Sequence, residues 1–383
     1  MSIGTVSIYI LGALSAGIIL VHSVVAVGTV ITRILELRMV RSHRSETPRP
    51  SVSVLVPARN EQYALPRLLE SFEKQETSDF EIVLVNDRST DDTASIMEEF
   101  RRAHGDRVKV VTVEEAPAGG NPKQNALACG SAVAGGEIIL MTDADCTVPP
   151  TWVERTVGFF ANEQVGVVFG PVFPVDLSRW LRQYQSFDHV FRYFYTAGSA
   201  GIGNATGGFG NNLAVRRQAL DAVGGFAGLR HSVTEDAELI SQVRDQRRWL
   251  IRAHTSPKAT VHPEPQVTIG ALLKQGLRWN TGALFAPDWA TRASFGTVML
   301  FLFASVVLAP VAAVFPPILL LAGGAFVSMM LMGILAGIYA RRPGRYWAML
   351  VPNVLFSMLF YSLVTLLTLM RAQISWKGNT VRR

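Results

Sequence analysis

Hydrophobic residues gather at the two ends of this chain and leave a polar block between them. Residues 3–32 contain no Asp, Glu, Lys or Arg, and a helix of that length can cross a bilayer core of about 30 Å. From residue 298 onward the chain is again mostly apolar, whereas residues 50–290 have the mixed composition of a soluble domain. The pattern predicts a soluble block that is held at a membrane by apolar segments on both sides.

Three apolar segments follow the soluble block, and we expect two or three of them to cross the membrane. They cover residues 298–315, 318–339 and 346–370. Four arginines from Arg33 to Arg44 directly follow the N-terminal segment, and basic flanks tend to stay in the cytoplasm. The soluble block is therefore expected on the cytoplasmic side of the cell membrane.

The last apolar segment leaves the topology open. With three spans the arginines within 341–345 stay in the cytoplasm, but the basic tail at 372–383 is carried outside, against the same tendency. The alternative is that one C-terminal segment is re-entrant or interfacial. Both arrangements agree with the hydropathy of the chain.

Within the soluble block, strand patterns and helix patterns alternate. Apolar runs of strand length occur at 52–57, 80–85 and 108–113, and a fourth run leads to Asp143. Helical spacing appears between the runs, for example at 122–134. Such alternation predicts an α/β fold with an open, mostly parallel sheet, whose ligands bind beyond the carboxyl ends of the strands.

Two carboxylates stand at the end of the fourth run, in the sequence Asp143-Ala144-Asp145. If strand geometry continues through them, both side chains point to one side, where they repel each other unless a cation lies between them. Carboxylate oxygens suit Mg²⁺ or Mn²⁺, and substrate phosphates commonly complete the coordination of such ions. An isolated pair of this kind is equally typical of a solvated acidic loop, so the assignment depends on the surrounding motifs.

Further polar motifs follow in a fixed order along the soluble block. They are Val56-Pro57-Ala58-Arg59-Asn60-Glu61, Asn86-Asp87 with Ser89 and Asp91, Asp143-Ala144-Asp145, Thr234-Glu235-Asp236, and Gln275 with Arg278 and Trp279. In this order they resemble the motifs of membrane-bound family 2 glycosyltransferases, such as bacterial lipid or carotenoid glucosyltransferases. The resemblance covers residues 50–290 and implies a GT-A fold, a UDP-sugar donor and an inverting transfer without a covalent enzyme intermediate.

The resemblance assigns a donor-binding role to six residues and a metal to two carboxylates. The donor residues are Pro57, Arg59, Glu61, Asp87, Lys123 and Asp143, and the ligands of Mg²⁺ or Mn²⁺ are Asp143 and Asp145. Asp87 would meet the uracil and ribose, although an Asp in such a turn also serves as a turn cap. Lys123 lies in a first helical turn, where its charge opposes the helix dipole, which favours a functional role over a solvated lysine.

The resemblance also implies four catalytic residues, Asp236, Gln275, Arg278 and Trp279. Asp236 is expected to be the general base for the acceptor hydroxyl, a role worth about 10²–10⁴-fold in rate, although Thr234-Glu235-Asp236 also has the form of a helix start. Arg278 can pair with the donor diphosphate, and Trp279 offers a flat face to a sugar ring or a base. The same helix also has the pattern of an amphipathic helix at a membrane surface.

Two further segments are candidates for contact with the acceptor or with lipid. Asn211 and Asn212 lie in a glycine-rich segment and could contact the acceptor. Residues 180–195 form an aromatic helical stripe, for which core packing is the expected role and an interfacial helix the alternative.

These features favour an enzyme that moves one sugar, expected to be glucose from UDP-glucose, to a hydroxyl of a membrane lipid at the cytoplasmic face. Ceramide, diacylglycerol, a hydroxylated carotenoid and a polyprenyl phosphate are candidate acceptors. A processive polysaccharide synthase shares the motifs but generally needs more spans, and a scaffold with a degenerate nucleotide-binding domain disagrees with the intact acids. The net charge of +6 gathers beside the apolar ends, which favours anionic lipid over nucleic acid as a partner.

The chain is expected to divide into six consecutive segments. They are an anchor at 1–33, a basic linker at 34–50, a catalytic domain at 51–264, an amphipathic region at 265–295, C-terminal spans at 296–371 and a basic tail at 372–383. Only Cys129 and Cys146 are present, and a cytoplasmic location makes a disulfide between them unexpected.

Overall fold

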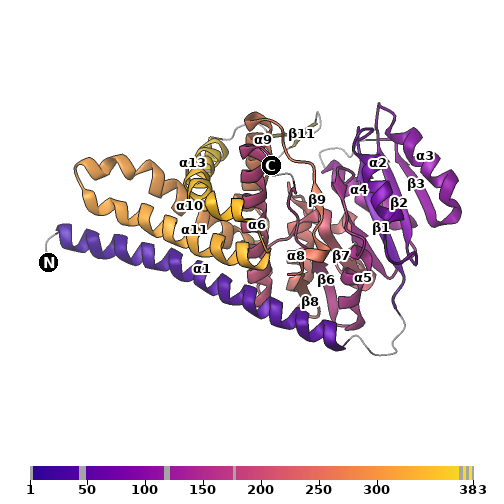
Figure 1. Ribbon diagram of the computed structural model, residues 1–383, viewed down its shortest axis with the longest axis horizontal. Coiled ribbons are helices and arrows are strands. Elements are labelled where there is room, and N and C mark those ends of the chain that lie inside the picture. Colours follow the sequence, from indigo (N-terminus) through magenta and orange to yellow (C-terminus); the bar gives the residue numbers. More distant parts are fainter. Residues whose placement is uncertain are drawn as a thin grey trace.

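The protein, in a computed structural model, combines a twisted sheet with a bundle of long helices. The structure describes residues 3–42, 49–115, 121–175, 178–370, 374–376 and 379–381. The strands of the main sheet are β1 (Val52–Ala58), β2 (Glu81–Asp87), β3 (Val108–Val113), β4 (Ile138–Met141), β6 (Val165–Phe169), β7 (Leu213–Arg216) and β8 (Leu250–Ala253). Figure 1 shows this sheet on one side and the long helices extending away from it on the other.

The helices fall into two groups. Those of the soluble block are α2 (Leu65–Glu73), α3 (Thr93–His104), α4 (Pro122–Val133), α5 (Trp152–Val157), α6 (Trp180–Gly201), α7 (Arg217–Asp221), α8 (Glu235–Asp245) and α9 (Ile269–Leu284). The others are α1 (Ile3–Ser42), α10 (Trp289–Val307), α11 (Leu319–Tyr339), α12 (Gly344–Ala348) and α13 (Leu350–Leu369). Two short pairs of strands, β5 (Cys146–Thr147) with β9 (His262–Pro263) and β10 (Ile374–Trp376) with β11 (Asn379–Val381), complete the described elements.

The strand order in the main sheet is β3-β2-β1-β4-β7-β6-β8. Pairing is parallel except at β7, which runs antiparallel to both β4 and β6. The residues of β4 are all buried, as expected for a strand with both faces covered. The open, mostly parallel sheet predicted from the sequence is confirmed.

The two carboxylates after the fourth strand do not continue its geometry. Pairing of β4 with β1 ends at Met141, and a backbone hydrogen bond from N of Cys146 to O of Asp143 (3.1 Å) closes a turn. Asp143 and Asp145 are therefore held by a turn, and the strand alternation expected for them does not apply.

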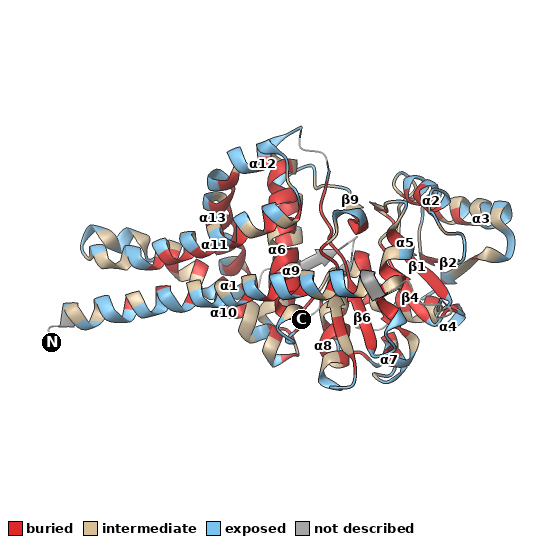
Figure 2. Ribbon diagram, turned by 60° about the horizontal axis from the view of Figure 1, so that its bottom comes forward, coloured by how far each residue is buried: buried red, intermediate tan, exposed pale blue. Residues whose placement is uncertain are grey.

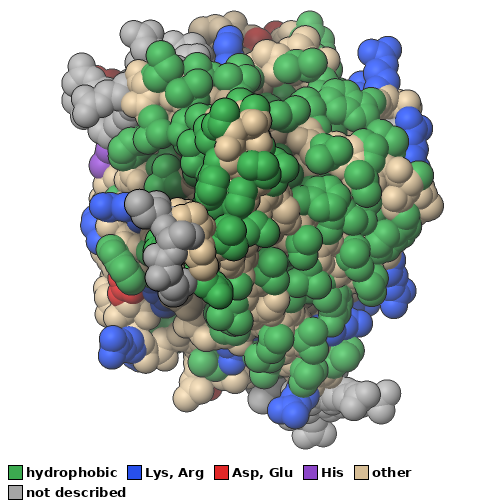
Figure 3. All heavy atoms as spheres, turned by 90° about the vertical axis from the view of Figure 1, so that its left-hand side faces the viewer, with side chains coloured by type: hydrophobic (Ala, Val, Ile, Leu, Met, Phe, Trp, Pro, Cys, Tyr) green, Lys and Arg blue, Asp and Glu red, His purple; other side chains and the backbone are tan. Residues whose placement is uncertain are grey.

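Four helices are long and apolar enough to cross a membrane, within the part of the chain that the structure describes. They are Gly4–Met39, Trp289–Val307, Pro316–Tyr339 and Leu350–Leu369. In Figure 1, α1, α10 and α11 extend together to the left, whereas α6 and α9 stand upright between this bundle and the sheet. Figure 3 views the bundle from its far end, where hydrophobic side chains cover most of the face and Lys and Arg lie toward its edges.

The first helix is longer than the expected anchor. It continues to Ser42, so the segment from 34 to 42 is helical and does not belong to a linker. The buried carboxylate of Glu36 explains this, because it accepts hydrogen bonds from N of Thr255 (3.0 Å) and from Arg33 (2.9 Å). The C-terminal part of α1 is thereby attached to the soluble block.

The aromatic stripe of α6 packs in the interior, as the expectation of core packing stated. Tyr184, Phe187 and Phe194 are almost completely buried, and Figure 2 shows α6 as a mostly buried helix. Where α6 crosses α1, a Cβ atom at Gly28 or Gly198 would come within 3.0 Å of a backbone oxygen of the facing helix. Small residues let helices approach this closely, as in membrane proteins.

We predict that Gly198→Val destabilises the protein far more than Gly17→Val. The added side chain at 198 would collide with Val25 of α1, and overpacking of this kind costs about 1–3 kcal/mol or more, whereas no atom lies within 4 Å of a Cβ at Gly17. Thermal unfolding of both variants in the same detergent measures the difference. Equal melting temperatures would show that the α1–α6 crossing is not a close contact.

Candidate active site

A cavity of about 450 Å³ lies at the carboxyl ends of β1, β2 and β4 and reaches α6, α9 and the start of α10. Its lining includes every donor, metal and catalytic candidate derived from the sequence, namely Pro57, Arg59, Glu61, Asp87, Lys123, Asp143, Asp145, Asp236, Gln275, Arg278 and Trp279. Residues from five separate motifs, together with Lys123, therefore share one space. The structure brings them together without assigning their roles.

The turns after β1 and β2 support each other at one end of the cavity. Asn60 accepts a hydrogen bond from N of Thr90 (2.8 Å), and its own N–H donates to Ser89 (3.1 Å). Asn60 and Arg88 both have left-handed backbone conformations, with φ of 54° and 56°, which are uncommon outside glycine. Arg88 also pairs with the buried Asp87 at 2.8 Å. These contacts fix the wall from which Pro57, Arg59, Glu61 and Asp87 line the cavity.

Lys123 connects the carboxylate turn to the start of α8. Its Nζ lies 2.7 Å from Asp143 and 3.2 Å from Glu235. Burial opposes the ammonium charge, but the two carboxylates outweigh burial and raise the pKa of Lys123 above its ordinary value. Asn121 caps α4 by accepting from N of Lys123 (3.0 Å), and its amide donates to Glu235 (3.2 Å). The unfavourable position of Lys123 in a first helical turn is thus compensated by two ion pairs.

Acidic side chains outnumber basic ones around the cavity. Among the described residues seven carboxylates face five cationic side chains, the acids being Glu61, Asp87, Asp143, Asp145, Glu235, Asp236 and Glu264 and the bases Arg59, Lys123, Arg192, Lys274 and Arg278. An excess of two negative charges in one space favours a bound divalent cation. The described residues hold no group of three or more His, Cys, Asp or Glu suited to a metal, so Asp143 and Asp145 would share the ion with oxygens of a ligand.

Asp236 is held in the first turn of α8 by two backbone amides. Its carboxylate accepts from N of Gly210 and from N of Ala237, each at 2.8 Å. Burial and then the charge of Glu235 raise the pKa of Asp236 to about 6, although Lys123 and the two amides act in the opposite direction. Thr234 is the N-cap residue of this helix but makes no capping hydrogen bond through its side chain.

Helix α9 forms the opposite wall. Gln275, Arg278 and Trp279 line the cavity from this helix, and Oε1 of Gln275 is buried without a hydrogen-bond partner among the described residues. Trp279 contacts α6, with His189 edge-on at a centroid distance of 5.3 Å and the guanidinium of Arg192 at 4.9 Å from its ring. The aromatic face of Trp279 is therefore fixed by α6 as well as by its own helix.

The two asparagines of the glycine-rich segment have different places. Asn211 lines the cavity, as expected for an acceptor contact. Asn212 is buried, accepts from the indole of Trp152 (2.9 Å) and donates to the carbonyls of Pro171 and Ala259, both at 2.9 Å. All of these bonds are internal, so Asn212 holds the fold and is not available to a ligand.

Polar residues of α6 also line the cavity and were not identified from the sequence. They are Gln185, His189, Arg192 and Thr196. Their spacing places them on one face of the helix. This polar stripe has the same helical period as the aromatic stripe, so the two could not be separated in the sequence. Nδ1 of His189 contacts the carbonyl of Val172 at 3.2 Å, and burial lowers its pKa to about 4. His189 therefore faces the cavity as a neutral imidazole.

Comparison with known proteins supports one family. Residues 18–382 match the family described as glycosyl transferase family 21. The beta-monoglucosyldiacylglycerol synthase of Synechocystis sp. is 30% identical over 62% of this chain and 49% of its own length. The enzyme of the same name from Nostoc sp. is 29% identical over 80% of this chain and 68% of its own length. The chain thus spans about half of the first relative and about two thirds of the second.

A solved structure shows the same architecture. The mannosyltransferase PcManGT from Pyrobaculum calidifontis, in complex with GDP-Man and Mn²⁺, superposes with a TM-score of 0.51 at 17% identity. The match covers 94% of this chain and 99% of that chain. At this identity the likeness concerns the fold, and the GT-A fold expected from the motifs is confirmed.

Proposed function

Because this chain belongs to glycosyl transferase family 21, we propose that it transfers one glucose from UDP-glucose to a hydroxyl of a membrane lipid. The observation that carries the proposal is the single cavity in which the Asp143–Asp145 turn and Asp236 face a wall built by α6, α9 and α10. A glucosylated diacylglycerol appears in the names of the relatives, which supports glucose as the sugar and diacylglycerol as the first acceptor to test.

The donor is placed by the sheet side of the cavity. Asp87, held by Arg88 at the end of β2, is positioned to accept from the uracil and ribose, with Pro57, Arg59 and Glu61 beside it. Lys123 and Arg278 approach the diphosphate from opposite walls. Opposed cations balance the charge that grows on a departing diphosphate without needing to move during the reaction.

Asp143 and Asp145 would hold Mg²⁺ or Mn²⁺ beside the diphosphate. Such an ion supplies Lewis-acid stabilisation of the nucleoside diphosphate leaving group. Two carboxylates with a lysine beside them suit an ion whose remaining ligands come from the substrate. Lys123 lies 2.7 Å from Asp143 and so partly offsets the mutual repulsion of the two carboxylates.

Asp236 acts as the general base. Its carboxylate accepts the proton of the lipid hydroxyl, the hydroxyl oxygen bonds to the anomeric carbon, and the bond to UDP breaks on the opposite side. The transfer inverts the anomeric carbon, so an α-linked donor yields a β-glucoside, the configuration in the names of the relatives. The amides of Gly210 and Ala237 orient the carboxylate for this proton transfer.

The proposal includes an arrangement in the membrane. We infer that α1, α10 and α11 cross the bilayer and that α13 lies at its cytoplasmic surface. Contacts of α13 advance along α6, from Asn353 with Gln183 (3.3 Å) to Tyr361 with Arg192 (2.8 Å). Helix α13 therefore follows the layer that lines the cavity, and Figure 1 shows it beside α6 and α9.

The two faces of α13 support a position at the surface. Its exposed side is apolar and comprises Val351, Leu355, Leu359, Leu363 and Leu366. Its buried side is mixed, with the polar residues Asn353, Ser357, Tyr361, Thr365 and Thr368 among apolar ones such as Val354 and Val364. A helix with lipid on one side and protein on the other fits this distribution. The arginines within 341–345 and the tail after α13 then stay on the side of the catalytic domain, as basic segments tend to do.

Membranes containing the enzyme are expected to transfer label from UDP-glucose to diacylglycerol and to yield one product with a single glucose. The label should disappear from the lipid extract when EDTA removes divalent ions and return with Mg²⁺ or Mn²⁺. A ladder of longer glycans would instead identify a polysaccharide synthase, and label on polyprenyl phosphate alone would identify a different acceptor. Transfer that is unaffected by EDTA would reject the metal role of Asp143 and Asp145.

Activity is expected to fall as the pH drops through about 6. The raised pKa of Asp236 means that its carboxyl becomes protonated at this pH and can no longer accept a proton. Asp236→Asn should lower kcat by about 10²–10⁴-fold and abolish this acidic limb. Asp221→Asn, at an exposed position at the end of α7, serves as the control with unchanged kcat. An acidic limb near pH 4 in the wild type would contradict the assignment.

Cysteine labelling tests the membrane arrangement. In sealed right-side-out vesicles, Val314→Cys, between α10 and α11, should react with an impermeant maleimide because this position is 85% exposed at the far end of the bundle. Met370→Cys, at the end of α13 and 70% exposed, should react only after the vesicles are opened. Labelling of Met370→Cys in sealed vesicles would show that α13 crosses the bilayer.

A further inference from the structure

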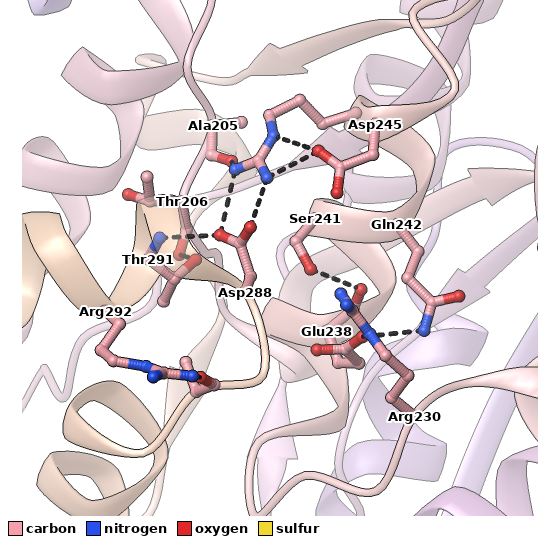
Figure 4. A network of polar contacts seen from close by, with 12 residues as sticks. Ala205, Thr206, Arg230, Glu238, Ser241, Gln242, Asp245, Asp288, Thr291 and Arg292 are labelled. Carbon is pink, nitrogen blue, oxygen red and sulfur yellow. Dashed lines mark hydrogen bonds and ion pairs between the residues drawn. The ribbon is translucent and has the colours of Figure 1, made fainter.

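Two charged pairs attach neighbouring parts of the protein to α8, and Figure 4 shows both. Arg230 pairs with Glu238, and Arg244 pairs with Asp288. The first pair connects α8 only to the loop that precedes it. The second connects the helix that carries Asp236 to the residue that begins α10, one of the membrane helices.

The Arg244–Asp288 pair is buried and has two-point geometry. The two nitrogens of the guanidinium lie 2.7 Å and 3.3 Å from the two carboxylate oxygens. Side-chain exposure is 14% for Arg244 and 8% for Asp288, so solvent screens the pair only weakly. Burial alone would raise the pKa of Asp288. The hydrogen bonds from Arg244 and Thr291 outweigh burial and lower this pKa to about 2. The geometry and the lowered pKa of Asp288 both describe a buried ion pair.

Helix α8 and the start of α10 both contact the same stretch of main chain next to this pair. Arg244 donates to the carbonyl of Ala205 (3.0 Å). Asp288 caps α10 by accepting from N of Thr291 (2.7 Å), and the hydroxyl of Thr291 donates to the carbonyl of Thr206 (2.9 Å). Two consecutive carbonyls are thus held from α8 and from α10.

This stretch of main chain leads to the general base. Residues 206–210 line the cavity, and N of Gly210 donates to the carboxylate of Asp236 (2.8 Å). The contacts close a ring that runs from Asp236 along α8 to Arg244, across to Asp288 and α10, and back through residues 205–210. Displacement of α10 relative to the catalytic domain would therefore move a hydrogen bond of Asp236.

The ring meets the membrane at the start of α10. Trp289 follows Asp288 and is 76% exposed, and Phe285 is 50% exposed just before it. Exposed aromatic residues at the end of a spanning helix commonly lie at the level of the lipid headgroups. Asp288 is thus buried in the protein, whereas the next residue, Trp289, is exposed where the bilayer is expected.

We propose that the Arg244–Asp288 pair is a positioning element that holds Asp236 at a fixed depth relative to the membrane end of α10. The inference rests on the proposed function, because a fixed depth matters only for an acceptor that stays in the bilayer. A lipid hydroxyl reaches the cavity at a depth set by its headgroup, and the base must be at the same depth. Neither Arg244 nor Asp288 touches the substrate in this role.

The test is Asp288→Asn, with kcat and KM measured for UDP-glucose and for diacylglycerol in bilayers. Asparagine caps helices about as well as aspartate, so the start of α10 is preserved while the charge of the pair is lost. We expect kcat for lipid transfer to fall about 10²-fold, since a misplacement of about 1 Å can cost that much, and KM for UDP-glucose to change less than twofold. Arg244→Lys, which keeps the charge but loses the two-point geometry, should retain part of kcat.

Arg230→Gln is the matched control, because it breaks the other ion pair of α8 without touching residues 205–210 or α10. It should keep kcat within twofold even if the melting temperature falls as in Asp288→Asn. Equal losses of kcat in both variants, or an unchanged kcat in Asp288→Asn, would overturn the proposal. If Asp288→Asn does not fold, Thr291→Val is the substitute test, because it removes only the hydrogen bond to the carbonyl of Thr206. The proposal then predicts a fall in kcat that is smaller than the fall expected for Asp288→Asn, and an unchanged kcat would overturn it. Absence of lipid transfer by the wild type would instead reject the proposed function.

Discussion

The accumulation of carboxylates at the ends of the strands is the constraint on which the site depends. Seven acids in a cavity of about 450 Å³ repel each other, and Lys123 counters this repulsion from within by contacting Asp143 on one side and Glu235 on the other. The lysine thereby joins the Asp143–Asp145 turn to the helix that carries Asp236, the proposed base. The remaining excess of negative charge favours a divalent cation. Burial, followed by the charge of Glu235, raises the pKa of Asp236.

The packing of the long apolar helices imposes the second constraint. Helices α6, α9 and α13 bury polar residues, such as Gln183, Asn280 and Asn353, among apolar ones, and the exposed side of α13 is apolar. The close crossing of α1 and α6 at Gly28 and Gly198 fixes this layer to the anchor. The helices α6 and α9 that line the cavity thus pack directly against the helices that are long and apolar enough to cross a membrane.

The sequence predicted the family, the GT-A fold and the gathering of the motif residues, because strand ends in a parallel sheet meet at one edge. It did not predict the turn that holds Asp143 and Asp145, since strand pairing, and not composition, determines where β4 ends. Residues of α6 such as His189 and Arg192 were missed because their polar spacing lies within an aromatic stripe that also fits core packing. The internal bonds of Asn212 depend on Trp152, which is distant in sequence. The roles of the motif residues remain predictions.

A lipid acceptor changes what a glycosyltransferase site has to achieve. A soluble acceptor can adjust its approach in three dimensions, whereas a lipid hydroxyl is confined to a narrow range of depths by the cost of withdrawing its chains from the bilayer. In the proposed function Asp236 must therefore be aligned both with the donor at the ends of the strands and with the surface of the membrane. Lys123 supplies the first alignment by joining α8 to the carboxylate turn. The Arg244–Asp288 pair, which joins the same helix to α10, is the contact best placed to supply the second.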